Sequence, residues 1–379
     1  MQRPIRIMLA AAAVLLGACA SPRPVRVVTW NVEDLRPVPP ARTDASRARA
    51  IAGVIRRLDP DVLLLNEIAY DRPEGPGWEP GAPPGSNAQR FADEHLPDLR
   101  LTAWMPETNT GEPSGHDLDR SGRAVTTPPP YRPGRPTPEQ LAFANDAHGF
   151  GVYPGQYAMA LLVAPGHRIL HDRIRTFRLF RWADMPGAVP PRALDGSPWY
   201  TDEAWAAFRL PSKTLAVVPV LLKDGGVLHC VISHPTPPAF DGPEGRNKHR
   251  NRDEILLIKA YLENEPWLVD DQGRPGGLPP GAHAVVLGDL NADPKDGDSV
   301  GDPIGRLLKS PVLGPDPEPV APTPQDGLDP WDTSTFGLRV DYVLPSAGLR
   351  VVGTGVWREI EGPDGPASDH FPGWAESIV

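Results

Sequence analysis

Short apolar runs and helix-like apolar spacings alternate along the chain. Apolar runs bounded by polar or turn residues are typical of buried strands, and we expect strands at 25–31, 61–68, 157–163, 215–222, 227–233, 283–290 and 339–345. Helical spacing predicts helices at 45–58 and 252–264, the second with an Asn version of the capping box in Asn251 and Glu254. This order of elements predicts an α/β fold.

Proline is unusually frequent, at 50 of 379 residues, which is about 13% against about 5% in an average protein. Three proline-rich or polar stretches, 71–139, 181–212 and 311–331, separate the predicted strands, and none is apolar enough to form a second core. We therefore expect one domain over residues 20–379 with Pro-rich loop insertions. Long loops on a rigid scaffold often shape a binding site.

The first nineteen residues have the layout of a secretory signal, with Arg3 and Arg6 before an apolar run at 7–16. The run ends in Leu-Gly-Ala-Cys19, which resembles the bacterial lipoprotein box, in which the cysteine is lipidated. Residues 1–19 are thus interpreted as a lipoprotein signal peptide and lipobox. The resemblance implies an exported protein, lipid-anchored in the bacterial cell envelope on a periplasmic or extracellular face. The alternative is an ordinary cleaved signal with a chance cysteine.

Cysteine content and charge narrow the possible functions. Cys19 and Cys230 are the only cysteines, which excludes a disulfide framework and a cysteine metal cluster. Cys230 lies in an apolar run and is interpreted as a small buried hydrophobic residue. The net charge of −10 does not attract polyanions unaided, although a bound divalent cation could supply positive charge locally.

Several apolar runs end in a polar side chain capable of chemistry, namely Asn31, Glu67, His234, Asp289, Asn291, Asp341, Asp369 and His370. Taken singly, each has a plain structural explanation, such as a turn or a surface ion pair. A buried carboxylate without a partner is costly, so a carboxylate at a strand end needs one nearby. If the strands lie side by side, these groups meet at one edge of the sheets and become one another's partners.

The motifs TWN, NE, SHPTPP, GDLNADP, DYVLPS and SDH occur in this order and together resemble the endonuclease/exonuclease/phosphatase superfamily, the DNase I-like group. The similarity extends over about residues 25–370. It implies a four-layer α/β sandwich with two central mixed β-sheets flanked by helices, and an Mg²⁺-dependent site, with Mn²⁺ possible, at one end of them. Pro372 and Gly373 follow SDH after a single residue, which argues against the apolar closing strand usual in this superfamily.

Carried over to this chain, the resemblance implies that Glu67 is the principal metal ligand, with Asn31 and Asp369 beside it. Oxygen ligands of this kind suit Mg²⁺. Asp289 would orient or deprotonate the attacking water, and Asn291 would bind the phosphoryl oxygens.

Two histidines complete the implied mechanism. His234 would protonate the departing oxygen, and Asp341 would pair with His370 so that its imidazolium stabilises negative charge on phosphorus. The implied reaction is metal-assisted in-line hydrolysis of a phosphodiester or phosphomonoester. The alternative is a non-catalytic binding module that retains the fold, but its signature would be a missing ligand or histidine, and none is missing.

Basic residues gather just before the predicted helix at 252–264, at Arg246, Lys248, His249, Arg250 and Arg252. Together with free N–H groups at a helix start they could bind a phosphate, and a solvated loop with a helix cap explains them equally well. We expect a phosphoester substrate to contact Tyr157, Lys213, Arg246 and Arg250. No protein partner is implied.

The lipid anchor on Cys19 is testable apart from any chemistry. The protein should fractionate with membranes, and Cys19→Ala should release it into the soluble fraction, because the acylated cysteine is then lost. Wild-type protein found wholly in the soluble fraction would contradict the anchor and favour an ordinary signal peptide.

Overall fold

The computed structural model describes residues 23–36, 45–73, 75–132, 134–363 and 365–378. The predicted signal peptide and lipobox, including Cys19, lie outside the described residues. Among the helices described, none is long and apolar enough to cross a membrane.

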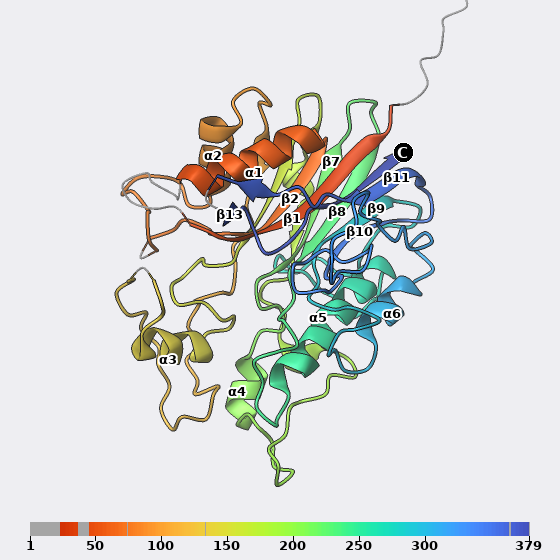
Figure 1. Cartoon of the computed structure of the whole chain (residues 1–379). Coiled ribbons are helices and arrows are strands. Elements are labelled where there is room, and N and C mark those ends of the chain that lie inside the picture. The colour runs from red at the N-terminus through yellow and green to blue at the C-terminus, as the bar shows by residue number, and fades with distance from the viewer. Residues whose placement is uncertain (1–22, 37–44, 74, 133, 364, 379) are drawn as a thin grey trace, which may run out of the picture.

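Two mixed β-sheets form the centre of the molecule (Figure 1). The first has the strand order β11 (Arg350–Val356), β14 (Gly373–Ile378), β1 (Val25–Leu35), β2 (Val62–Ile68), β4 (Met159–Val163), β3 (Thr102–Trp104). The second has the order β10 (Asp341–Pro345), β9 (His283–Asp289), β8 (Val227–Ser233), β7 (Leu215–Leu221), β5 (Arg168–Ile169), and β7 also pairs with β6 (Arg175–Thr176). Strands β1 and β2 run parallel, as do β8 and β9, and the other neighbours run antiparallel.

Helices cover the outer faces of both sheets. Helices α1 (Ala45–Leu58) and α2 (Asn87–His95) lie over the first sheet, and α5 (Arg246–Leu262) and α6 (Pro303–Leu308) lie over the second (Figure 1). The loops contain α3 (Pro138–Asp146), α4 (Asp202–Ala207), the 3₁₀ turns η1 (His171–Arg173) and η2 (Trp182–Asp184), and the small hairpin β12 (Glu361–Gly362) and β13 (Gly365–Pro366). The predicted α/β sandwich with two central mixed sheets is confirmed.

The long apolar runs follow from this layering, because most central strands are buried on both faces. In β1, Val28 and Trp30 belong to the apolar cluster beneath α1, which also contains Ile51. The alternate residues Val25 and Val27 belong to a second cluster, which lies between the two sheets. A third cluster packs α5 and α6 onto the second sheet. The central strands therefore present apolar side chains in both directions, and several of them end in polar residues where they leave the core.

The predicted start of the helix at 252 is wrong. Helix α5 begins at Arg246, and Asn251 and Glu254 are buried inside it. The carboxylate of Asp241 accepts hydrogen bonds from the backbone N–H groups of Asn247 (2.8 Å) and Lys248 (3.0 Å). These N–H groups therefore already have a carboxylate partner and are not free for a phosphate.

The stretches expected to be loops contain more structure than their composition indicated. Residues 71–139 supply helix α2 and strand β3, which extends the first sheet. The closing strand that Pro372 and Gly373 argued against is present as β14, which lies between β1 and β11. Pro372 directly precedes this strand, so the missing N–H of proline costs the β-ladder nothing.

Gly288 is required for the close approach of β8 and β9. Its φ is +150°, and a Cβ atom at this position would lie 1.9 Å from the carbonyl oxygen of Ser233. No other residue type fits such a contact without moving one of the strands. Glycine at this position therefore keeps the end of β9, with Asp289, beside the end of β8, with His234.

Two glycine substitutions should change stability in opposite directions. Gly288→Ala should lower the free energy of unfolding by on the order of 2 kcal/mol or more, because its Cβ clashes with backbone. Gly53→Ala should raise it by about 0.5–1 kcal/mol, because Gly53 lies inside α1 and a methyl group there would meet no atom of another segment within 4 Å. Urea denaturation of both variants measures the difference, and a Gly288→Ala protein as stable as wild type would contradict the close approach.

Candidate active site

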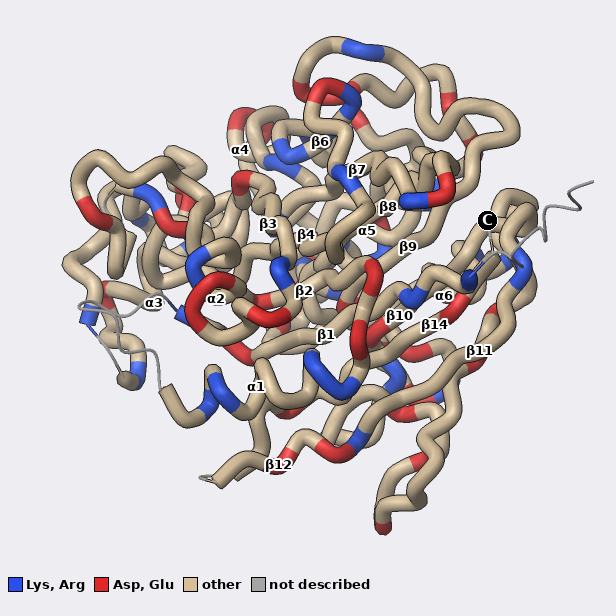
Figure 2. The backbone as a smooth tube through the Cα atoms, turned by 90° about the horizontal axis from the view of Figure 1, so that it is seen from above, with Lys and Arg blue, Asp and Glu red and all other residues tan. Residues whose placement is uncertain are grey.

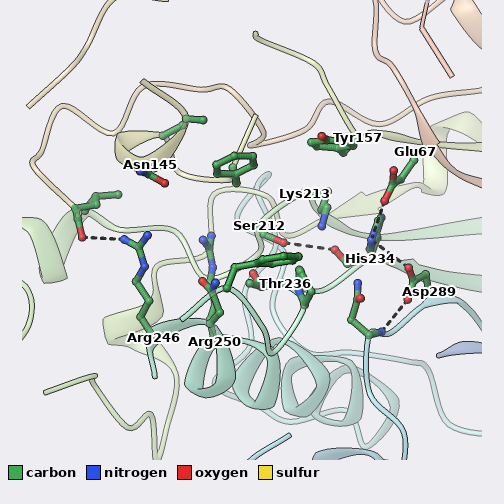
Figure 3. Close-up of a pocket in the computed structure, with 18 of the residues that line it drawn as sticks. Glu67, Asn145, Tyr157, Ser212, Lys213, His234, Thr236, Arg246, Arg250 and Asp289 are labelled. Atoms are coloured by element: carbon green, nitrogen blue, oxygen red, sulfur yellow. Dashed lines mark hydrogen bonds and ion pairs between the residues drawn. The ribbon is translucent and has the colours of Figure 1, made fainter. Parts of the chain in front are cut away.

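The polar residues at the strand ends converge on one cavity of about 570 Å³ at one end of the two sheets (Figure 3). Most of the predicted site residues line it, namely Glu67, Tyr157, Lys213, His234, Arg246, Arg250, Asp289, Asn291, Asp369 and His370. The two others, Asn31 and Asp341, are 1% exposed and contact the lining residues from behind. The structure thus brings all the predicted site residues to one cavity or directly behind it.

An irregularity at the end of β1 places Glu67. The register of β1 against β2 shifts between Asn31 and Leu35, and Asp34 there donates its N–H to Glu67 Oε2 at 3.1 Å. Glu67 itself has a φ of +63°, which interrupts the two-residue alternation of β2. Asn31 then donates through Nδ2 to both Glu67 Oε1 (3.1 Å) and Asp289 Oδ2 (3.0 Å), so one amide joins the two carboxylates.

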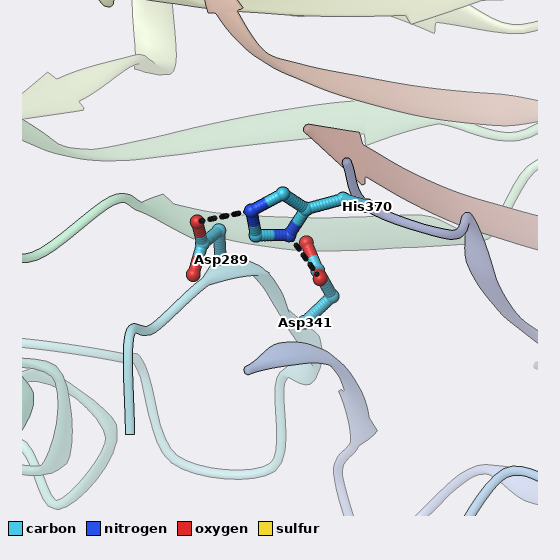
Figure 4. Close-up of side chains that lie close together, drawn as sticks. All are labelled: Asp289, Asp341 and His370. Carbon is cyan, nitrogen blue, oxygen red and sulfur yellow. Dashed lines mark hydrogen bonds and ion pairs between the residues drawn. The ribbon is translucent and has the colours of Figure 1, made fainter. Parts of the chain in front are cut away.

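Strand register also brings Asp289 and Asp341 together. They are directly opposed in the antiparallel pair β9–β10, which places their side chains on the same face. The imidazole of His370 lies between the two carboxylates (Figure 4). Its Nδ1 is 2.9 Å from Asp341 Oδ2, and its Nε2 is 3.8 Å from Asp289 Oδ2.

The backbone around His370 is fixed by buried hydrogen bonds. Ser368 donates through Oγ to the carbonyl of Asn31 at 2.7 Å and accepts the N–H of His370 at 3.1 Å. The indole Nε1 of Trp30 donates to the carbonyl of His370 at 2.9 Å. The end of β1 and the SDH motif are therefore fastened to each other although they are more than 330 residues apart. No pattern in the sequence predicted that Ser368 would make these hydrogen bonds.

The charge state of His370 follows from its neighbours. Burial alone lowers the pKa of an imidazole, but here the carboxylates of Asp341 and Asp289 outweigh burial and raise the pKa of His370 to about 10. Asp289, Asp341 and His370 lie close enough to share a metal ion. However, a protonated imidazole cannot ligate a metal, so this trio is better explained as two carboxylates around an imidazolium.

Glu67 is the carboxylate of the cavity that best suits a cation. Burial raises the pKa of its carboxyl to about 7, although the hydrogen bond from Asn31 opposes this shift. Among the described residues, no lysine or arginine forms a salt bridge with it, and His234 Nε2 is 3.9 Å away. A divalent cation would balance this carboxylate, and the oxygens of Glu67 and Asp369 are donors that a hard cation prefers. The amide of Asn31 faces Glu67 with its Nδ2, and its Oδ1 accepts the N–H of Glu33 at 3.0 Å. The residues present therefore fit such an ion.

His234 and Lys213 form the wall opposite Glu67. The Nε2 atom of His234 is 3.5 Å from Asp289 Oδ2, and burial together with Lys213 and His370 holds the pKa of His234 well below its usual range. The imidazole is therefore neutral in the free site. Lys213 is buried and donates to the carbonyl of Pro235 at 3.4 Å, and burial lowers its pKa.

Asn291 and Tyr157 complete this end of the cavity in left-handed backbone conformations, with φ of +51° and +54°. The N–H of Asn291 donates to Asp289 Oδ1 at 2.9 Å, and its Nδ2 donates to the carbonyl of Pro235 at 3.1 Å. Burial raises the pKa of Tyr157, so its hydroxyl keeps its proton. Non-glycine residues rarely adopt positive φ, and such residues concentrate at functional sites.

The cavity continues beyond these residues into a part whose aromatic lining the sequence did not predict. Four aromatic residues line it, namely Phe150, Tyr200, Phe208 and Phe240. Arg246 and Arg250 lie at this end, away from Glu67 (Figure 3). Single aromatic residues in loops have no periodic spacing, so no pattern in the sequence could assign them to the site.

Solved structures with the same fold were found. The endonuclease/exonuclease/phosphatase protein of Beutenbergia cavernae is 18% identical with a TM-score of 0.54, over 94% of this chain and 72% of that one. The human Nocturnin catalytic domain, solved with a bound sulfate anion, is 14% identical with a TM-score of 0.51, over 94% of each chain. Humanized D. rerio TDP2 is 10% identical with a TM-score of 0.50, over 94% of this chain and 99% of that one. None of the curated proteins matches.

The family itself is established by the sequence. The model of the Endonuclease/Exonuclease/phosphatase family matches residues 28–370, which is most of the chain and contains every strand-end residue of the cavity. The chain therefore belongs to the Endonuclease/Exonuclease/phosphatase family of hydrolases that act on phosphoester bonds, and its fold and its converging carboxylates and histidines agree with this.

Proposed function

We propose that the protein is an Mg²⁺-dependent phosphoesterase that hydrolyses a P–O ester bond by in-line attack of water. The observation that supports this most is that a position suited to a cation and a position suited to negative charge lie side by side at one end of the cavity. Glu67 is a half-buried carboxylate that forms no salt bridge with a lysine or arginine among the described residues, and next to it lies the imidazolium of His370 between two carboxylates. The first suits a cation, and the second suits negative charge that develops on a substrate.

Glu67 and Asp369 would bind the metal ion, and Asn31 would join them through Oδ1 once its amide turns from its hydrogen bonds to Glu67 and Glu33. The side chain of Asp369 is 48% exposed, so it can turn towards an ion at the mouth of the cavity. When bound, Mg²⁺ or Mn²⁺ would neutralise charge on the phosphoryl oxygens.

Asp289 is placed to act on the attacking water. Burial raises the pKa of its carboxyl to about 6, while His370 lowers it and Asp341 raises it. A carboxylate with a raised pKa is a better proton acceptor than an ordinary one. Asn291 and Lys213 line the same wall and can donate to phosphoryl oxygens.

The two histidines would act on different oxygens of one phosphorus. His370 is protonated before the substrate arrives and stabilises charge on the non-bridging oxygens. His234 is neutral in the free site, so it must gain its proton once the anionic substrate is bound beside it. The negative charge of a phosphoester favours this, because it opposes the effects of burial and of Lys213.

The location we propose is the bacterial cell envelope, with the chain anchored through lipid on Cys19.

Basic and acidic residues are interspersed over the view in Figure 2. With a net charge of −10, this arrangement favours a small phosphoester over a long polyanion.

Metal dependence is the first test. Activity on a phosphoester should be abolished by EDTA and restored by Mg²⁺ or Mn²⁺. Glu67→Gln should lower metal affinity and activity by about tenfold to a hundredfold or more. It should leave the melting temperature nearly unchanged, because it removes a half-buried charge that forms no salt bridge with a lysine or arginine within the described part of the chain. Glu359→Gln, an exposed carboxylate outside the cavity, is the control. Full activity in excess chelator would exclude the proposed reaction.

The roles of the histidines can be separated by the leaving group. His234→Ala and His370→Ala should each lower turnover by on the order of 10²-fold or more, and Asp341→Asn should resemble His370→Ala because it removes the carboxylate that orients and charges the imidazole. Changing a phenyl to a 2,4-dinitrophenyl leaving group should partly rescue His234→Ala alone, since only His234 supplies a proton. His171→Ala, exposed and remote, is the control. Equal rescue of both variants would show that these roles are wrongly assigned.

A further inference from the structure

The half of the cavity away from Glu67 ends in two arginines that lack carboxylate partners at hydrogen-bond distance among the described residues. Arg250 is 6% exposed. Its Nε donates to the carbonyl of Leu210 (2.9 Å) and its Nη2 to those of His148 (2.5 Å) and Arg209 (3.0 Å). Its Nη1 has no hydrogen-bond partner within the described part of the chain, and the residue lines the cavity. A buried guanidinium with an unused donor facing a cavity is a site for an anion.

The nearest acidic groups leave these arginines able to donate to an anion, although Glu244 forms a loose ion pair with Arg246. Glu254 accepts the backbone N–H groups of Ser212 (2.5 Å) and Thr236 (2.6 Å) with its two oxygens. Arg246 donates through Nη1 to the carbonyl of Leu118 at 3.1 Å, and its Nε is 3.8 Å from Glu244 Oε1, beyond hydrogen-bond distance. The two guanidinium groups thus add positive charge to the same end of the cavity.

The cavity also has aromatic walls with exposed faces. Phe240 is 89% exposed and Phe150 is 46% exposed, although both line the cavity. Phe240 also has a φ of +60°, a rare conformation for a bulky residue, which is maintained only where the surroundings require it. Exposed aromatic faces beside a cavity bind flat groups by stacking.

We propose that this half of the cavity binds the organic part of a small-molecule phosphoester, with a flat ring against Phe150 and Phe240 and a second anionic group at Arg246 and Arg250. This inference rests on the proposed function, because the scissile phosphoester would occupy the catalytic end. The cavity then selects substrates by two features remote from the scissile bond, which raises kcat/KM through binding.

Two matched probes test the second anionic group. Thymidine 5′-(4-nitrophenyl phosphate) and its 3′-phosphorylated counterpart share the ring and the scissile ester and differ by one phosphate. Their dissociation constants are measured by calorimetry on the Asp289→Asn protein with Mg²⁺, and their KM values on wild type by release of 4-nitrophenolate. The 3′-phosphate should tighten binding about tenfold or more, the usual scale for charge-assisted hydrogen bonds.

Arg246→Gln should abolish the preference for the 3′-phosphorylated probe and leave the affinity for the other probe within about twofold, since only the added phosphate contacts the guanidinium. Lys248→Gln removes the same charge from the same helix outside the cavity and should keep the full preference. Arg250 is avoided as a test because its hydrogen bonds to three carbonyls make it part of the fold.

The aromatic part is tested separately. Phe240→Ala should weaken both probes about tenfold, the scale of one lost stacking contact, whereas Leu194→Ala, which removes another exposed apolar side chain outside the cavity, should weaken neither. Equal affinity of the two probes for wild type, or a preference that survives Arg246→Gln, would overturn the subsite. Failure to hydrolyse any phosphoester while the binding preference persists would instead overturn the proposed function alone.

Discussion

The ion pair between His370 and Asp341 is the interaction on which the catalytic end of the cavity depends. Strand register forces Asp289 and Asp341 to face each other across β9 and β10, and two buried carboxylates at that separation cannot both be ionised without a nearby positive charge. His370 supplies that charge, with its Nδ1 2.9 Å from Asp341. Asp289 can then stay available for a reaction while Asp341 compensates the imidazolium.

The backbone that positions His370 explains why residues so far apart in sequence form one site. Ser368 bonds to the carbonyl of Asn31, and Asn31 bonds through its amide to Glu67 and Asp289. A displacement of any one strand end would therefore break contacts on the other sheet as well. The site depends on the distance between the two sheets, and the apolar cluster between them sets that distance.

Much of the fold and of the catalytic end could be predicted because both follow from simple patterns. Unbroken apolar runs indicate strands buried on two faces, and the polar residue that ends each run must find a partner at the same sheet edge.

The start of α5 could not be predicted, since Asn251 and Glu254 match a capping box but bond to groups outside the helix end. Asn251 donates to the carbonyls of Thr236 (2.9 Å) and Leu290 (3.0 Å), and Glu254 accepts two loop N–H groups. Local sequence does not reveal such tertiary partners. The aromatic lining of the cavity could not be predicted for the same reason, because Phe150 and Phe240 acquire their role only from the packing of distant loops.

The charges of the cavity resolve an apparent conflict between the acidic chain and an anionic substrate. The net charge of −10 would repel a phosphoester at long range. At short range the balance differs from place to place, because the carboxylates of Glu67, Asp289 and Asp369 line the cavity together with three basic residues, Lys213, Arg246 and Arg250. The two arginines lie away from Glu67 (Figure 3), and Lys213 and Arg250 are almost fully buried. Water cannot screen buried charges well, so their attraction grows steeply once a small anion enters. A long polyanion must keep most of its charges outside, over the acidic surface, and gains less from the same residues. The electrostatics of the chain thus agree with the proposal of a compact substrate that fits wholly inside the cavity.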